Sequence, residues 1–168
     1  LDGQFRLGLF IPGLISFLLA HACYIALFKT DAPWFASRHA LWLIAAIGAG
    51  MYAYLFTHGL PAAMRIPVAV YVSVIALMAA QAWGRYQVQQ DRSALLVALG
   101  ASAFMVSDSI LAINRFVQPL PWAAIWVLAS YYVAQALIVQ GSLRWQARPH
   151  TATDFSAQSE ILPATQPT

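Results

Sequence analysis

The stretch SALLVALGASAFMVSDSILAI, residues 93–113, decides the fold. Its one charged side chain is Asp108, and nearly all the others are apolar or small. About 20 mostly apolar residues are enough for a helix to cross the hydrocarbon core of a bilayer. The stretch therefore predicts a membrane-spanning helix that carries a carboxyl group well inside the membrane.

Four further stretches meet the same criterion, at residues 7–28, 40–57, 66–84 and 121–143. Of the 168 residues, 61% are hydrophobic and 9% are charged, whereas soluble domains carry about 25% charged residues. We therefore expect an all-α, polytopic membrane helix bundle over residues 1–143, with five transmembrane helices joined by short connections. Residues 144–168 are rich in Pro, Ser, Thr and Gln without an apolar period, which predicts a flexible polar cytoplasmic tail.

Single residues predict where three of these helices begin. Ser93 is a candidate N-cap, because a serine hydroxyl accepts a hydrogen bond from a free backbone N–H of the first turn. Pro67 and Pro121 fall at the starts of the helices at 66–84 and 121–143, where a missing N–H costs little.

The basic residues divide unequally between the two ends of the expected bundle. One side has Lys29, Arg38, Arg85, Arg92, Arg144 and Arg148, and the other has Arg6, Arg65 and Arg115. Loops rich in Lys and Arg stay in the cytoplasm, so we expect a cytoplasmic C-terminus in a multi-pass protein of the bacterial cytoplasmic (inner) membrane. The basic residues are scattered rather than aligned in a stripe, so we expect no nucleic-acid partner.

Asp108 is the residue most indicative of function. An ionisable side chain at such depth is costly and normally faces the interior of a helix bundle. On a helical wheel, the residues within roughly 40° of Asp108 are richer in Ala, whereas the opposite side is almost wholly large and aliphatic. The near side comprises Ala94, Val97, Ala101, Phe104, Ala112 and Arg115. We therefore expect Asp108 to face other helices or a cavity. A structural alternative is an Asp held by a neighbouring helix.

Other polar residues lie on stripes of their own. Tyr131 and Gln135 share one face of the helix at 121–143, and His21 and Tyr24 share one face of the helix at 7–28. Each pair has a purely structural interpretation as hydrogen-bonded contacts between helices. Cys23 is single, and no ligand spacing supports a metal site built from His21, His58 and Asp108, so we expect no metal.

Four segments, taken together and in order, resemble one family. They are Phe17–Tyr24, Pro67–Tyr71 with Met78 after it, Phe104–Phe116, and Tyr131–Gln135. In this order and spacing they resemble the YhhN family, also called the lysoplasmalogenase family, over residues 5–143. Each segment alone is weak evidence, whereas the ordered set over four helices is fairly specific.

The resemblance implies a bundle of about eight membrane helices that hydrolyses the vinyl ether bond of lysoplasmalogens. The products would be a fatty aldehyde and a glycerophospho-ethanolamine or -choline. Asp108 would act as catalytic acid or base, and no cofactor would be required. Residues that would bind or position the lysophospholipid substrate are His21, Tyr24, Tyr71, Arg115, Tyr131 and Gln135. Arg115 is included because a guanidinium near a membrane face suits the lipid phosphate.

The family also has an acidic Gly-Asp motif in a helix before the segment that matches residues 7–28. No residues here match that motif. We therefore expect this chain to be the C-terminal part of an eight-helix protein and to be inactive without the second carboxylate.

Two other classes of function stay open. A transporter or a lipid-binding membrane protein would use Asp108 as a coupling or binding carboxylate, and a structural membrane subunit would need it only for folding or assembly. The sequence has no evident internal repeat of the kind many transporters show, and no Gly-x-Ser-x-Gly motif of a serine lipase. It indicates neither the oligomeric state nor the physiological substrate.

Overall fold

Helices are the only regular secondary structure in the described part of the chain. A computed structural model describes the backbone of residues 2–29 and 32–146, and the side chains of residues 15–28 and 32–145. Within these residues the elements are α1 (Asp2–Lys29), α2 (Arg38–His58), the 3-10 helix η1 (Ala62–Met64), α3 (Arg65–Gln89), α4 (Arg92–Phe116) and α5 (Ala123–Gln146). The described ranges contain no β-strand, so the predicted all-α polytopic bundle is confirmed.

Four of the described segments are long and apolar enough to cross a membrane. They are Arg38–His58, Ala62–Gln89, Arg92–Phe116 and Ala123–Trp145. The part of α1 whose side chains are described is also apolar but shorter, at Ile15–Phe28. Large apolar side chains such as Trp42, Ile66 and Trp126 are exposed on the outside of the bundle, which suits lipid rather than water as the solvent.

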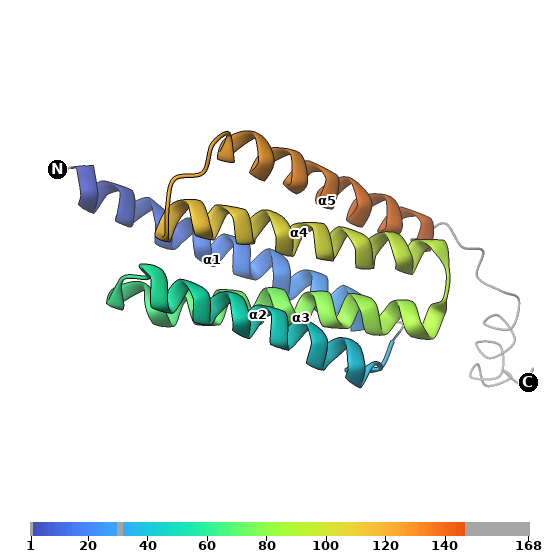
Figure 1. Ribbon diagram of the computed structural model, residues 1–168. Coiled ribbons are helices and arrows are strands. Elements are labelled where there is room, and N and C mark those ends of the chain that lie inside the picture. The colour runs from blue at the N-terminus through green and yellow to red at the C-terminus, as the bar shows by residue number, and fades with distance from the viewer. Residues whose placement is uncertain (1, 30–31, 147–168) are drawn as a thin grey trace, which may run out of the picture.

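The helices run side by side and alternate in direction (Figure 1). Helix α3 is central, because it contacts α1, α2 and α4, whereas α5 packs on α4. The alternation puts the Arg38, Arg92 and Arg144 ends of helices together, and the Arg65 and Arg115 ends opposite them. Which end faces the cytoplasm stays a prediction.

Helices α4 and α5 approach each other at two glycines. A Cβ atom added to Gly141 would lie 2.6 Å from Val97 Cγ2 and 2.7 Å from the Ser93 carbonyl oxygen. A Cβ added to Gly100 would lie 2.8 Å from Ile138 Cγ1. Small residues allow such close backbone approach, which is how membrane helices gain packing energy without a hydrophobic driving force.

The predicted start of α4 was wrong. Asp91 is its N-cap, with a side-chain oxygen that accepts from the Ala94 N–H at 2.8 Å. Ser93 is instead buried, and its hydroxyl donates to the Gly141 carbonyl at 2.7 Å. The carboxylate two residues earlier takes the capping position, and the serine is left to join two helices.

The predicted ends of other helices also shift. Trp122 has a left-handed backbone (φ 59°), so α5 begins after it at Ala123 and Pro121 lies outside the helix. Helix α3 continues to Gln89, because the residues after 84 include Arg85, Gln87 and Gln89, which favour helix without being apolar. Helix α5 includes residues 144–146 of the expected tail, and residues 147–168 lie outside the described residues.

Candidate active site

Asp108 faces the interior of the bundle, as the wheel predicted. Its neighbours on the same face of α4, Val97, Ala101 and Phe104, are almost completely buried, whereas Leu99 and Val106 on the opposite face are exposed. Tyr71 of α3 donates a hydrogen bond from its hydroxyl to Asp108 Oδ2 at 2.9 Å. The carboxyl group is therefore held between two transmembrane helices by one oxygen.

Asp108 lies on a cavity of about 740 Å³, enclosed mainly by α2, α3 and α4. Most of its wall is aliphatic or aromatic, with contributions from Ile47, Met51, Leu55, Val68, Ile75, Leu111 and Phe116. The polar groups on the wall are few and come mostly from α4: Ser107, Asp108, Ser109 and Arg115, together with Tyr71 and Tyr131. An apolar hollow with a few convergent polar groups is the usual form of a small-molecule site.

Arg115 lines the same cavity two turns after Asp108 on α4. Seven residues of helix correspond to a rise of about 10.5 Å, so the two side chains mark different depths of the cavity. Arg115 is exposed and lies in the last turn of α4. The cavity thus has a carboxyl group at depth and a guanidinium near one end of the bundle.

A layer of aromatic rings closes the side of the cavity that faces α1. Phe17 of α1 lines the cavity, and its ring centroid lies 5.4 Å from that of Tyr71 and 5.2 Å from that of Phe104. Phe104 is 1% exposed and contacts Tyr131 of α5 at 5.8 Å between ring centroids. The layer separates the Asp108 cavity from the polar groups of α1.

His21, Tyr24 and Gln135 lie behind that layer. The His21 ring packs between Phe17, tilted at a centroid distance of 4.2 Å, and Phe104, which meets it edge-on at 4.8 Å. The Tyr24 hydroxyl donates to Gln135 Oε1 at 3.4 Å, which joins α1 to α5. This contact is at the long end of hydrogen-bond distances.

The sequence-predicted site residues therefore form two groups. Tyr71, Arg115 and Tyr131 share the cavity with Asp108. The other three, His21, Tyr24 and Gln135, cluster beyond the aromatic layer. No group of three or more potential metal ligands occurs in the part of the chain that the structure describes.

Phe17, which lines the cavity, and Phe104, which packs against Phe17, were not expected as parts of the site. Phe104 was on the Asp108 face of the wheel, but it was taken as packing. Phe17 also begins one of the family-like segments, and it lies four residues before His21 on the same helix face.

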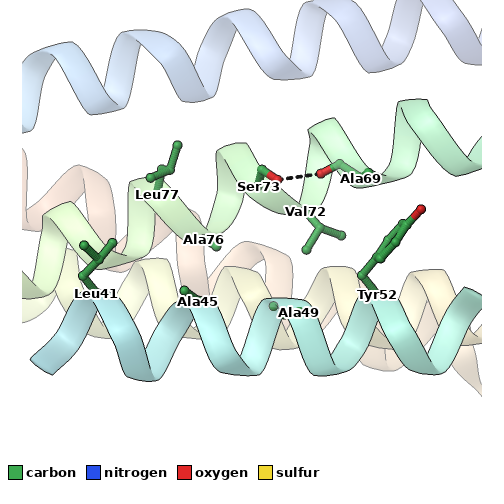
Figure 2. Close-up of a pocket in the computed structure, with 10 residues that line it drawn as sticks. Leu41, Ala45, Ala49, Tyr52, Ala69, Val72, Ser73, Ala76 and Leu77 are labelled. Atoms are coloured by element: carbon green, nitrogen blue, oxygen red, sulfur yellow. Dashed lines mark hydrogen bonds between the residues drawn. The ribbon is translucent and has the colours of Figure 1, made fainter.

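A second, smaller hollow of about 370 Å³ lies between α2 and α3 and is shown in Figure 2. Small residues such as Ala45, Ala49 and Ala76 line it, and the Ser73 hydroxyl donates to the Ala69 carbonyl at 2.8 Å. It has no ionisable group among its lining residues apart from the Tyr52 phenol, so the candidate site is the Asp108 cavity.

These features define a polytopic α-helical membrane protein with an intramembrane carboxyl group on an apolar cavity. The chain belongs to the YhhN family, whose sequence model matches residues 5–142. No solved structure matches the chain.

Curated relatives carry the name lysoplasmalogenase. The lysoplasmalogenase TMEM86B of Homo sapiens is 33% identical over 135 residues, which cover 80% of this chain and 54% of the relative. The lysoplasmalogenase TMEM86A of Homo sapiens is 31% identical over 134 residues, covering 78% of this chain and 54% of that protein. A lysoplasmalogenase of Mycobacterium bovis is 30% identical over 136 residues, covering 79% of this chain and 50% of that protein. The chain thus spans about half the length of the curated relatives it matches.

Proposed function

We propose that the full-length protein is a membrane-embedded hydrolase that cleaves the vinyl ether bond of a lysoplasmalogen-like lysophospholipid at Asp108. The observation that carries the proposal is the Asp108 carboxyl group, oriented by Tyr71 on the wall of an apolar cavity inside a membrane bundle. The relatives named lysoplasmalogenase support the same reaction.

The reaction needs a proton donor and a site that excludes most water. Hydrolysis of a vinyl ether begins when an acid adds a proton to the carbon of the double bond that is remote from oxygen. The resulting oxocarbenium ion takes up one water, and the hemiacetal collapses to an aldehyde and an alcohol. Glycoside hydrolysis passes through a similar cation and uses carboxyl groups to protonate, to stabilise the cation or to activate water.

Asp108 can supply one of these carboxyl groups. Tyr71 occupies Oδ2, which leaves Oδ1 to meet the substrate or a water. A carboxyl group fixed through one oxygen holds the other in a defined direction, and such positioning lowers the entropic cost of reaching the transition state. Asp108 is the one carboxyl group among the described residues that line the cavity. We assign the second to the family's Gly-Asp motif, which this sequence does not match.

The distribution of polarity in the cavity suggests how a lipid lies in it. The aliphatic and aromatic wall suits the single hydrocarbon chain, and burial of each CH₂ group contributes about 0.8 kcal/mol. Arg115, near one end of the bundle, suits the phosphate, because a guanidinium binds phosphate oxygens in pairs. In such a lipid the vinyl ether bond lies between the hydrocarbon chain and the phosphate. It would therefore lie deeper in the cavity than Arg115, beside Asp108. By the positive-inside rule, this mouth would face away from the cytoplasm and the C-terminus would be cytoplasmic.

Aldehyde release from a lysoplasmalogen tests the proposal. We expect full-length wild-type protein in lipid nanodiscs to release aldehyde, and Asp108→Asn to lower kcat by about 10²-fold or more, the usual contribution of a positioned acid or base. Asn keeps the size of the side chain and can still accept the Tyr71 hydrogen bond, so the fold should survive.

Asp91→Asn is the matched control. It removes a carboxylate from the same helix, far from the cavity, and Asn caps a helix as well as Asp does. The control should retain wild-type turnover. A folded Asp108→Asn variant with undiminished turnover would remove Asp108 from the mechanism. Solute transport without aldehyde release would instead favour a transporter.

A further inference from the structure

His21 has a ring nitrogen without a partner among the described residues. The side chain is 2% exposed, and its Nδ1 lies 2.7 Å from the carbonyl oxygen of Phe17, one turn earlier on α1. A carbonyl oxygen can only accept, so Nδ1 carries the hydrogen. In the neutral ring Nε2 is then a bare acceptor, and it is buried without a hydrogen bond from any described residue.

Leaving a buried acceptor unpaired costs about 1–3 kcal/mol. Folded proteins satisfy the great majority of their buried polar atoms, so an exception indicates a place where another donor binds. The environment of the atom narrows the choice of donor.

Aromatic rings surround the His21 imidazole. Phe17 and Phe104 lie at 4.2 and 4.8 Å between ring centroids, and Tyr24 meets it edge-on at 6.2 Å. A buried water typically needs two to four polar partners, which these ring faces do not offer. A hydroxyl group on a mostly apolar ligand needs only one acceptor, and the ligand's hydrocarbon surface suits the rings.

The cavity of Asp108 is separated from the His21 ring by the Phe17 side chain. Phe17 lines the cavity and also packs against the His21 ring. Rotation of this one side chain to another staggered rotamer would open a path from the cavity to the His21 ring. A ligand in the cavity could then reach His21 without movement of a helix.

We propose that His21 Nε2 accepts a hydrogen bond from the free glycerol hydroxyl of a single-chain phospholipid bound in the Asp108 cavity. The inference rests on the proposed function and adds the group that selects the substrate. A two-chain phospholipid carries an acyl group in place of that hydroxyl hydrogen. It would therefore leave Nε2 unpaired and place the acyl group against Phe17, so His21 would select the lyso form.

Binding of an uncleavable lipid tests the inference. A saturated alkyl-ether lysophospholipid and its analogue with hydrogen in place of the glycerol hydroxyl are bound to the full-length protein in nanodiscs. We expect wild type to bind the hydroxyl compound about tenfold more tightly, the effect of one buried hydrogen bond. His21→Phe should bind both compounds equally, and His21→Gln, which keeps an acceptor, should recover part of the preference.

His58→Phe is the matched control, because His58 is exposed at the end of α2 and does not line the cavity. It should keep the full tenfold preference. Phe17→Ala gives an independent test should His21→Phe fail to fold, since an opened wall should increase the preference for the hydroxyl compound.

Three results would overturn the assignment: a preference that survives in His21→Phe, no preference in wild type, or no increase in Phe17→Ala. Equal binding of both lipids by wild type would show that the glycerol hydroxyl does not bond to Nε2. The lipids are not cleaved, so the failure of aldehyde release would refute the proposed function separately.

Discussion

The two sides of helix α4 are packed in opposite ways. Toward α5 the backbones touch, because Gly100 and Gly141 leave no room for a Cβ, and the Ser107 hydroxyl donates to the Val127 carbonyl at 3.0 Å. Toward α2 and α3 the helices leave a cavity of about 740 Å³, and Asp108 lies on it. Ser107 and Asp108 are consecutive and both line the cavity, and the Ser107 hydroxyl also bonds to α5, so the packed and hollow sides meet at these two residues.

The difference between the two sides shows how a membrane helix bundle can fix the position of a carboxyl group beside a cavity. Lipid gives no hydrophobic force between helices, so rigidity must come from close contact and interhelical hydrogen bonds. The α4–α5 pair supplies both along its length, with hydrogen bonds from Ser93 and Ser107. The α4 backbone is thereby fixed, and Asp108 needs only the Tyr71 hydrogen bond to complete its position.

Filling the packed side should have the largest effect. We expect Gly141→Val to destabilise the protein by about 1–3 kcal/mol or more, because the new side chain collides with Val97 and the Ser93 carbonyl. Thermal unfolding in detergent, followed by loss of helical circular dichroism, measures the change. Gly50→Val is the matched control, since a Cβ at Gly50 meets nothing within 4 Å. Equal unfolding temperatures for both variants would contradict the packing described.

The packed side also shows why the sequence predicted the helices better than their ends. Five apolar runs were enough to predict five helices, since the length of a run and its composition are local properties. Helix ends depend on competition between neighbouring residues. Ser93 was expected to cap α4, but Asp91 has the capping role and Ser93 bonds to a helix distant in sequence.

The hollow side could be predicted in part. The wheel oriented Asp108 correctly, because small residues on one face of a single helix are visible in the sequence. The partner of Asp108 could not be derived from the helix wheel, since Tyr71 reaches it from another helix. The split of the site by Phe17 and Phe104 was likewise invisible, because it depends on how α1 lies against α3 and α4.

Loosening the carboxyl group on the hollow side should have an intermediate effect. We expect Tyr71→Phe to lower kcat/KM for lysoplasmalogen about tenfold, the loss of one hydrogen bond to a carboxyl group, with little change in unfolding temperature. Aldehyde release measures the rate. Tyr54→Phe removes a hydroxyl from an exposed tyrosine of α2 that does not line the cavity, and it should retain wild-type activity. A wild-type rate in Tyr71→Phe would show that the hydrogen bond from Tyr71 is not required to position Asp108.

The smallest effect should come from the mouth of the hollow side, where Arg115 is exposed to solvent. Exposed charges are screened, so we expect Arg115→Gln to raise KM for the phospholipid only about three- to fivefold and to leave kcat unchanged. An alkenyl glycerol without phosphate should show no such change, because its binding never used the guanidinium. Arg65→Gln controls for charge at the same end of the bundle, since the Arg65 guanidinium lies 4.4 Å from the centroid of the Phe56 ring and does not line the cavity. A rise in KM with both substrates would assign Arg115 to the shape of the mouth rather than to the phosphate, and the cavity would then select its lipid by the chain and the hydroxyl alone.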